Sequence, residues 1–221
     1  MTITSRSRLK TLVGAGSVVY ASNDEDRRTG ITRAIALAKI AEKEKITGLF
    51  TADLLQADPD GLSGSTGSQD PLITLAALSQ VTSHIGLIAT VSTTFQHPYN
   101  LARLIGTLDH VSGGRAGWNA VTSSVGEENF GEITLPAPEV RYARATEFIE
   151  VINALFDANQ PDAVRRNKSG SVSIDPRKLH PIDYHGDFFR VQGPLNVPPP
   201  PQHRPVQFQA GQSEEGLKLG A

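Results

Sequence analysis

The stretch from Thr90 to Ser124 constrains the fold more tightly than any other part of this sequence. It begins inside the run Ile85 to Val91, whose nearly continuous apolar character is typical of a parallel strand buried on both faces. The pair His97-Pro98 then starts a helix with apolar residues at helical spacing, and Gly113-Gly114 ends it. A second apolar strand follows at Ala116 to Thr122. This order predicts two parallel strands joined by a crossover helix.

The same alternation of strand and helix extends over most of the chain. Further strands are predicted at Thr11–Tyr20, Leu49–Ala52 and Val206–Ala210. Further helices are predicted from Ile31 up to Gly48, from Pro71 to about Ser83, from Val140 to Phe156 and from Ser213 to Ala221. Strands that alternate with helices predict an α/β fold with a parallel sheet, either an open doubly wound sheet or a (β/α)8 barrel.

Two features favour the (β/α)8 TIM-barrel type. Polar residues gather at the carboxyl ends of several strands, at Asp53, Thr90, Ser213 and the run Asn119 to Ser124, which is where barrel enzymes build their sites. The segment Gly14-Ala15-Gly16 lacks the third glycine of a dinucleotide fingerprint.

The length indicates an incomplete barrel. A complete one needs about 250 residues, whereas this chain has 221. We expect a single domain over residues 1–221 that holds about the first five βα units of a barrel. Residues 157–205 are expected to form an inserted loop or hairpin and a proline-rich connector.

Composition and charge narrow the classes of function. The net charge is −2 and no long basic run is present, so no nucleic-acid partner is expected. No apolar run approaches the ~20 residues of a membrane span. The lack of cysteine excludes disulfides and thiolate ligands and agrees with a reducing compartment, so we expect a cytoplasmic protein. The six histidines are scattered without zinc-site spacing, so no metal site is predicted.

Residues 1–22 leave two interpretations open. Arg6, Arg8 and Lys10 precede the mildly apolar run Leu12 to Ala21, which weakly resembles a targeting segment. The alternative is a basic turn followed by the first strand, which the glycines in the apolar run favour.

Five side chains are candidates for a small-molecule site, and each has a simpler structural alternative. Ser213 follows a strand and starts a helix, so it either contacts a phosphate or caps the helix. Asp53 either orients a ligand or caps the next turn. Thr90 either reaches a pocket or is simply a hydroxyl group at the end of a strand. Tyr142 either reaches a pocket or is an ordinary half-exposed tyrosine on a helix. His97 is either a ligand or proton donor, or simply the residue that begins a helix.

Several longer motifs resemble one known family. They are FQHPYNLAR (95–103), TLDHVSGGRAGWNAVTS (107–123), NFG (129–131), RYARATEF (141–148), GPLNVP (193–198) and QAGQS (209–213). In order and length they resemble the bacterial luciferase-like flavin monooxygenases, in the branch of nitrilotriacetate, EDTA and dibenzothiophene-sulfone monooxygenases. The resemblance covers about Ile31 to Ala221.

The resemblance implies a barrel that holds reduced FMN, which a separate flavin reductase supplies, and that uses O2 to oxidise a small organic substrate. By position in the motifs, the flavin contacts would be Asp53, Thr90, Tyr142 and Ser213, and His97 would be the catalytic candidate. The chain is expected to form a homo-oligomer or to pair with a complementary chain.

This sequence departs from the family pattern at three places. Pro138 stands where the family often has a histidine, four residues before the motif tyrosine, so one flavin contact is expected to be missing. The segment Tyr20 to Arg28, which follows the first predicted strand, is shorter and more charged than the family pattern. The last strands of a barrel have no counterpart among the predicted strands. Two alternatives therefore stay open: a truncated, catalytically inactive relative that needs a partner chain, and a deazaflavin-dependent oxidoreductase.

Overall fold

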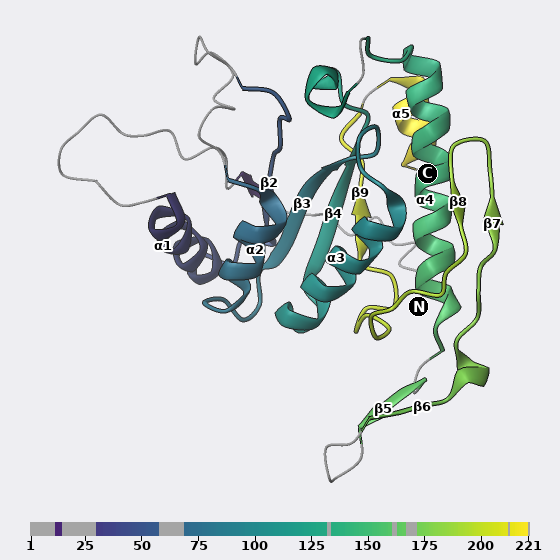
Figure 1. Cartoon of the computed structure of the whole chain (residues 1–221). Coiled ribbons are helices and arrows are strands. Elements are labelled where there is room, and N and C mark those ends of the chain that lie inside the picture. Colours follow the sequence, from purple (N-terminus) through teal and green to yellow (C-terminus); the bar gives the residue numbers. More distant parts are fainter. Residues whose placement is uncertain are drawn as a thin grey trace.

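A twisted parallel sheet with helices around it forms the body of the protein (Figure 1). The computed structural model describes residues 12–14, 30–57, 69–131, 134–160, 163–166, 172–211 and 213–220. The strands of the main sheet are β1 (Leu12–Gly14), β2 (Gly48–Thr51), β3 (Gly86–Ser92), β4 (Ala116–Val121) and β9 (Val206–Phe208). The helices are α1 (Gly30–Lys43), α2 (Pro71–Ser79), α3 (Pro98–Ser112), α4 (Pro138–Ala158) and α5 (Glu214–Leu219), with a 3-10 turn η1 (Glu127–Phe130) after β4.

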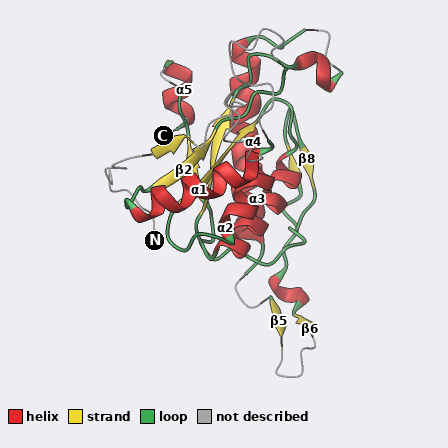
Figure 2. Cartoon of the chain, turned by 90° about the vertical axis from the view of Figure 1, so that its left-hand side faces the viewer, coloured by secondary structure: helices red, strands yellow, loops and turns green. Residues whose placement is uncertain are grey.

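The sheet has five strands in the order β1-β2-β3-β4-β9, and every neighbouring pair is parallel. Helices α2 and α3 contact β3 and β4, and α4 packs against α3. Figures 1 and 2 show these helices outside the sheet. Sequential parallel strands with helices on the outer side are the arrangement of a (β/α)8 barrel. The predicted α/β fold, an incomplete barrel with about the first five βα units, is confirmed.

The helices begin and end where the local sequence satisfies their free backbone groups. Asp70 caps α2, with Oδ1 accepting from the Ile73 N–H at 2.9 Å, and Pro71 occupies the first turn. Gly113 ends α3 in the left-handed conformation, with φ of 69°. The apolar stripe of α3, which includes Leu101, Ile105 and Leu108, is buried in the core between the helices and the sheet.

Helix α2 is shorter than predicted. It ends at Ser79 rather than at about Ser83. The Arg115 guanidinium donates to the carbonyl oxygens of Ser79, Thr82 and Ile85 at 2.9 to 3.1 Å, and to Thr82 Oγ1 at 3.0 Å. The Ser79 carbonyl oxygen is the acceptor that the Ser83 N–H would use in a further turn, and the Ser83 N–H donates to Glu42 instead.

Arg115 thus joins three elements at the amino-terminal edge of the sheet. Its Nε also donates to the carbonyl oxygen of Ser112 at the end of α3, at 2.7 Å. Nearby, Glu42 near the end of α1 accepts from the backbone N–H groups of Ser83, His84 and Ile85. Residues of this edge, opposite the functional face of a barrel, serve stability.

Asp109 ties the proline-rich connector to the same edge. Its fully buried carboxylate accepts from the Ala116 N–H, from the Gln202 N–H at 2.9 Å and from Gln202 Nε2 at 2.6 Å. Gln202 Nε2 also donates to the Ala116 carbonyl oxygen at 2.8 Å. The connector is therefore held against α3 and β4 immediately before the chain enters β9.

Two antiparallel hairpins lie between α4 and the connector. The first pairs β5 (Val164–Arg166) with β6 (Val172–Ile174), and the short turn η2 (Pro176–Lys178) follows it. The second pairs β7 (Tyr184–His185) with β8 (Arg190–Val191). Figure 1 shows β7 and β8 running along the outer side of α4, while β5 and β6 project away from the sheet.

Some expectations lie outside the described residues. These are the strand Thr11–Tyr20 beyond β1, most of residues 1–22 and the segment Tyr20 to Arg28. In the part of the chain that is described, no helix is both long and apolar enough to cross a membrane.

Replacing Arg115 by lysine is expected to lower the free energy of unfolding by about 2–3 kcal/mol, because one ammonium group cannot reach the carbonyl groups that the guanidinium joins. Urea unfolding followed by circular dichroism measures the change. Arg103→Lys is the matched control, because Arg103 lies exposed on α3, and its effect is expected to stay within about 0.5 kcal/mol. Equal effects of the two substitutions would contradict the structural role of Arg115.

Candidate functional site

The carboxyl ends of β3 and β4 bring one predicted site residue together with an asparagine. Thr90 pairs with Asn119 in the β3–β4 register, and Asn119 Nδ2 donates to Thr90 Oγ1 at 3.3 Å. Because side chains alternate along a strand, both lie on the opposite face from Ala89 and Trp118, which belong to the core beneath the helices. Asn119 is 2% exposed, and its Oδ1 has no hydrogen-bond donor among the described residues. A buried carbonyl oxygen without a donor is complementary to an N–H group of a ligand.

A second pair joins two predicted residues that are far apart in the sequence. The hydroxyl groups of Tyr142 and Ser213 are 3.1 Å apart, so one donates to the other. Tyr142 lies in the second turn of α4, and Ser213 caps α5, with Oγ accepting from the Gly216 N–H at 3.0 Å. The cap expected as the simpler alternative for Ser213 is therefore present, together with the contact to Tyr142. Two hydroxyl groups in contact can both turn toward an anionic oxygen.

Asp53 lies two residues after β2 and is half-buried. Burial raises the pKa of its carboxyl above the usual value, the charge of Asp70 raises it further, and a hydrogen bond from the Leu54 N–H opposes both. A carboxyl with a raised pKa holds a proton to higher pH, which allows it to donate as well as accept a hydrogen bond.

His97 caps α3 through its ring. Nδ1 accepts from the Tyr99 N–H at 3.3 Å, so Nε2 is the nitrogen that remains for a proton. The ring meets Phe189 edge-on with centroids 5.8 Å apart. Burial lowers the pKa of His97, and the charge of Arg144 lowers it further. The imidazole is therefore held in its neutral form at lower pH than a free histidine.

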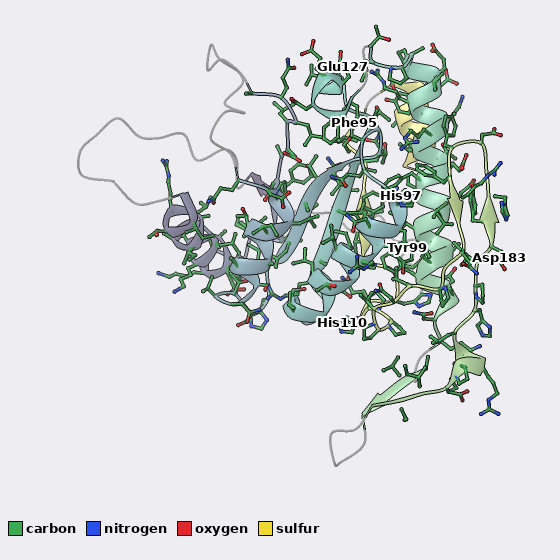
Figure 3. All side chains as sticks on the ribbon, in the orientation of Figure 1. Phe95, His97, Tyr99, His110, Glu127 and Asp183 are labelled. Carbon is green, nitrogen blue, oxygen red and sulfur yellow. The ribbon has the colours of Figure 1, made fainter. Side chains whose placement is uncertain are left out.

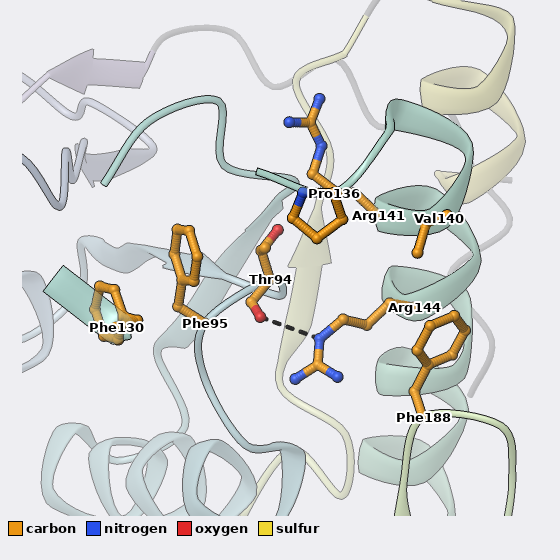
Figure 4. A pocket seen from close by; sticks show the side chains of 8 residues that line it. All are labelled: Thr94, Phe95, Phe130, Pro136, Val140, Arg141, Arg144 and Phe188. Atoms are coloured by element: carbon orange, nitrogen blue, oxygen red, sulfur yellow. Dashed lines mark hydrogen bonds between the residues drawn. The ribbon is translucent and has the colours of Figure 1, made fainter. Parts of the chain in front are cut away.

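A cleft of about 290 Å³ lies beside these residues, between the loop after β3 and the start of α4. Its lining residues are Thr94, Phe95, Phe130, Pro136, Val140, Arg141, Arg144 and Phe188 (Figure 4). Phe95 and Phe130 stack with centroids 4.6 Å apart and form one wall. Figure 3 shows Phe95 above His97, at the same end of the molecule as Glu127 and opposite His110.

Arg144 is fixed at the base of this cleft. Its Nε donates to the carbonyl oxygens of Thr93 and Thr94 at 3.3 and 3.1 Å. Its Cζ lies 4.3 Å from the centroid of the Phe189 ring, a cation–π contact. The guanidinium charge is therefore held at one place between the loop after β3 and the turn between β7 and β8.

The buried carboxylate of Glu147 holds that turn in place. It accepts from the backbone N–H groups of Asp187, Phe188 and Phe189 at 2.7 to 3.1 Å. Gly186 precedes these residues, and a Cβ atom there would lie 2.1 Å from Glu147 Oε1. Glycine is thus required for the close approach that brings Phe188 into the cleft and Phe189 beneath Arg144.

The predicted site residues lie in different environments. Tyr142 and Ser213 are in contact with each other. Asp53 lies after the end of β2 and His97 at the start of α3, and neither is part of that contact. Asn119 and Arg144 were not among the predicted site residues. Asn119 lies inside β4, where the polar run Asn119 to Ser124 begins. Arg144 lies three residues after Arg141, a spacing that places both on one face of α4. No group of residues suited to hold a metal ion occurs in the described ranges.

Comparison with known proteins identifies the family of this chain. The sequence model of the luciferase-like monooxygenase family matches residues 11–221 of this chain. The chain belongs to the luciferase-like monooxygenase family. The predicted family is thereby confirmed.

Relatives within the luciferase-like monooxygenases are similar over most of this chain. N-acetyl-S-(2-succino)cysteine monooxygenase of Bacillus subtilis (strain 168) is 44% identical over 187 residues, which cover 84% of this chain and 42% of the relative. Nitrilotriacetate monooxygenase component A of Aminobacter aminovorans is 40% identical over 216 residues, which cover 91% of this chain and 48% of the relative. The chain spans about half the length of the curated relatives it matches.

A solved luciferase-like structure has the same fold. EDTA monooxygenase from Chelativorans sp. BNC1 superposes with a TM-score of 0.76 and 35% identity, covering 92% of this chain and 49% of that one. Riboflavin lyase, determined with modified FMN and riboflavin, superposes with a TM-score of 0.81 and 32% identity over 94% of this chain and 51% of that one.

Replacing Gly186 by alanine is expected to lower the free energy of unfolding by about 2–4 kcal/mol, because the new methyl group displaces the buried Glu147 carboxylate from its donors. Thermal and urea unfolding measure the change. Gly106→Ala in α3 is the control, because a Cβ there meets its neighbours at ordinary contact distances of 3.5 Å or more. It is expected to be neutral or to stabilise by up to ~1 kcal/mol. A neutral Gly186→Ala variant would rule out this role for Gly186.

The pKa of His97 is expected to lie below about 6.5, the usual histidine value, and to rise in Arg144→Gln, because one cause of the shift is then removed. Since the unfolded chain binds this proton more readily, His97 weakens folding as pH falls through the usual histidine pKa and below it. NMR titration of the ring protons measures the pKa, with the exposed His84 as the comparison. A His97 pKa above that of unfolded peptides would contradict the described environment.

Proposed function

We propose that this chain provides part of the active site of a flavin-dependent monooxygenase, which uses reduced FMN and O2 to oxidise a small organic compound. Membership in the luciferase-like monooxygenase family supports the reaction class. The observation that supports a flavin site most directly is the Tyr142–Ser213 hydroxyl pair at the carboxyl end of the sheet, because it offers polar hydrogens for a phosphate. Bound reduced FMN would supply the electrons for O2 activation.

The residues described fit such a cofactor at two separated places. Tyr142 and Ser213 would hold the phosphate through their hydroxyl groups. Asn119 Oδ1, which is buried without a donor, would accept from the N–H of the flavin pyrimidine ring, and Thr90 would orient the Asn119 amide. Asp53 would hydrogen-bond a polar edge of the ligand, aided by its raised pKa.

His97 is proposed as the residue that holds or moves a proton. Its Nδ1 is occupied by the Tyr99 N–H, so proton exchange would take place at Nε2. The lowered pKa keeps the ring neutral, so that Nε2 carries a proton that can be donated. The apolar ring of Phe189 beside it restricts water on that side.

Reduced flavin is proposed to come from a separate reductase. One relative is named component A of nitrilotriacetate monooxygenase, a name that supports a multicomponent system for that enzyme. Because this chain spans about half of that relative, the complete active site is proposed to need further barrel strands, in the same polypeptide or in a complementary chain.

Tyr142→Phe is expected to weaken FMN binding about tenfold and to leave riboflavin binding unchanged, because the lost hydroxyl would bind the phosphate of FMN, which riboflavin lacks. Fluorescence titration of both flavins measures this difference. Tyr99→Phe is the control, because Tyr99 is a partly buried tyrosine packed against the core.

Turnover is tested with a flavin reductase and NADH, by following O2 consumption in the presence of candidate substrates. A folded chain that binds neither FMN nor riboflavin would overturn the proposed flavin site. Tighter binding of a deazaflavin than of FMN would instead support a hydride-transfer enzyme.

A further inference from the structure

The motif Asn129-Phe130-Gly131 lies at the end of η1, the 3-10 turn that follows β4. Gly126 precedes the turn in the left-handed conformation, with φ of 97°, which residues other than glycine rarely adopt. The Asn129 N–H donates to the Gly126 carbonyl oxygen at 3.1 Å and closes the turn. The backbone of η1 therefore gives the side chains of Asn129 and Phe130 defined starting points.

Asn129 joins η1 to the segment after β2, which is distant in the sequence. Its Nδ2 donates to the carbonyl oxygen of Leu55 at 2.8 Å. Because a carbonyl oxygen only accepts hydrogen bonds, the amide nitrogen is the end of Asn129 that faces it. Gly126 packs against the same carbonyl group, since a Cβ atom there would lie 2.9 Å from the Leu55 oxygen. One hydrogen bond and one close backbone approach thus hold the two segments together.

The segment that Asn129 holds carries Asp53. Leu55 follows Asp53 by two residues, a separation that an extended chain spans with at most about 7 Å. A fixed Leu55 carbonyl group therefore limits where the Asp53 side chain can lie. Burial is the largest cause of the raised pKa of Asp53, so this carboxyl responds to any movement of the segment that admits water.

Phe130 ties the same turn to the loop after β3. Its ring stacks on Phe95, with 4.6 Å between centroids and 6° between the ring planes (Figure 4). The Phe95 N–H donates to Ser92 Oγ at 3.2 Å, and Ser123 Oγ donates to the same oxygen at 2.7 Å. The loop that carries Phe95 is thereby fixed to the ends of β3 and β4. Asn129 consequently connects the segment after β2 to a turn that is itself anchored.

We propose that Asn129 is a positioning residue of the flavin site, whose hydrogen bond to the Leu55 carbonyl group holds Asp53 in place to contact the ligand. The proposal rests on the proposed function for the identity of the ligand, and it adds a residue that acts through Asp53. Asn129 is exposed, and its loss leaves the packing of Gly126 unchanged. Removal of its donor is therefore expected to loosen the Asp53 segment without unfolding the chain.

NMR titration of the Asp53 carboxyl carbon tests the positioning without any ligand. Asn129→Leu keeps the size of the side chain and removes the donor. It is expected to lower the pKa of Asp53 by about 0.5, toward the usual aspartate value of about 3.9, because water reaches the carboxyl of the looser segment. Asn129→Ala, which also lacks the donor, is expected to act in the same direction. Circular dichroism of each variant verifies folding.

The matched control is Asn100→Leu, the same change at an exposed position of α3. It is expected to leave the pKa of Asp53 unchanged.

Fluorescence titration with riboflavin and with FMN tests whether Asn129 acts through Asp53. Asn129→Leu is expected to weaken the binding of both flavins about fivefold, the effect of one hydrogen bond, because the Asp53 contact does not involve the phosphate. Asp53→Asn is also expected to weaken both. Because the two residues act as one unit, adding Asn129→Leu to Asp53→Asn is expected to cause no further loss.

Two results would refute the positioning role. One is the same Asp53 pKa in the wild type and in both Asn129 variants. The other is a fivefold weakening by Asn129→Leu that persists in the Asp53→Asn background, since Asn129 would then act independently. A folded chain that binds neither flavin, but whose Asp53 pKa falls in the Asn129 variants, would retain the positioning role and count against the proposed function. Failures of the two proposals are therefore distinguishable.

Discussion

The arrangement of the cleft depends on one buried carboxylate. Glu147 points from α4 toward three successive backbone N–H groups, and these hydrogen bonds fix the turn between β7 and β8. Since a buried charge is tolerated only when donors surround it, the helix and the turn require each other. The same contact positions Phe189, whose ring lies under Arg144 and beside His97. Glu147, in the middle of α4, thereby helps to position the surroundings of the Arg144 guanidinium and the His97 imidazole.

The two ends of the sheet have different roles. At the amino-terminal edge, Arg115, Asp109 and Glu42 make hydrogen bonds mostly to backbone groups, which closes helix ends and holds the connector. At the carboxyl edge, Asn119 and Arg141 leave polar atoms without partners among the described residues. The unpartnered polar atoms at the carboxyl edge are available to a ligand at the edge where barrel enzymes build their sites.

The spacing of apolar residues in the sequence predicted the strands of the main sheet and the helices that pack on it, because apolar spacing and capping residues are local signals. The same signals identified Ser213 as a helix cap, and the family motifs proposed it and Tyr142 as site residues. They did not reveal that these two hydroxyl groups meet, since that contact depends on how α4 and α5 pack. Arg144 was missed for a related reason: its environment comes from the loop after β3 and from the inserted hairpin, which are distant in sequence.

The hairpin of β5 and β6 stands apart from every feature discussed above. It projects away from the sheet in Figure 1, and the chain on either side of it is clamped by the bridge between Asn159 and Leu179 and by the hydrogen bond from the His180 N–H to the Ala158 carbonyl oxygen. These contacts lie between the hairpin and the turn that Glu147 holds. The region is therefore a natural graft point, where an affinity tag or a fluorescent reporter can be inserted at a distance from the carboxyl edge of the sheet.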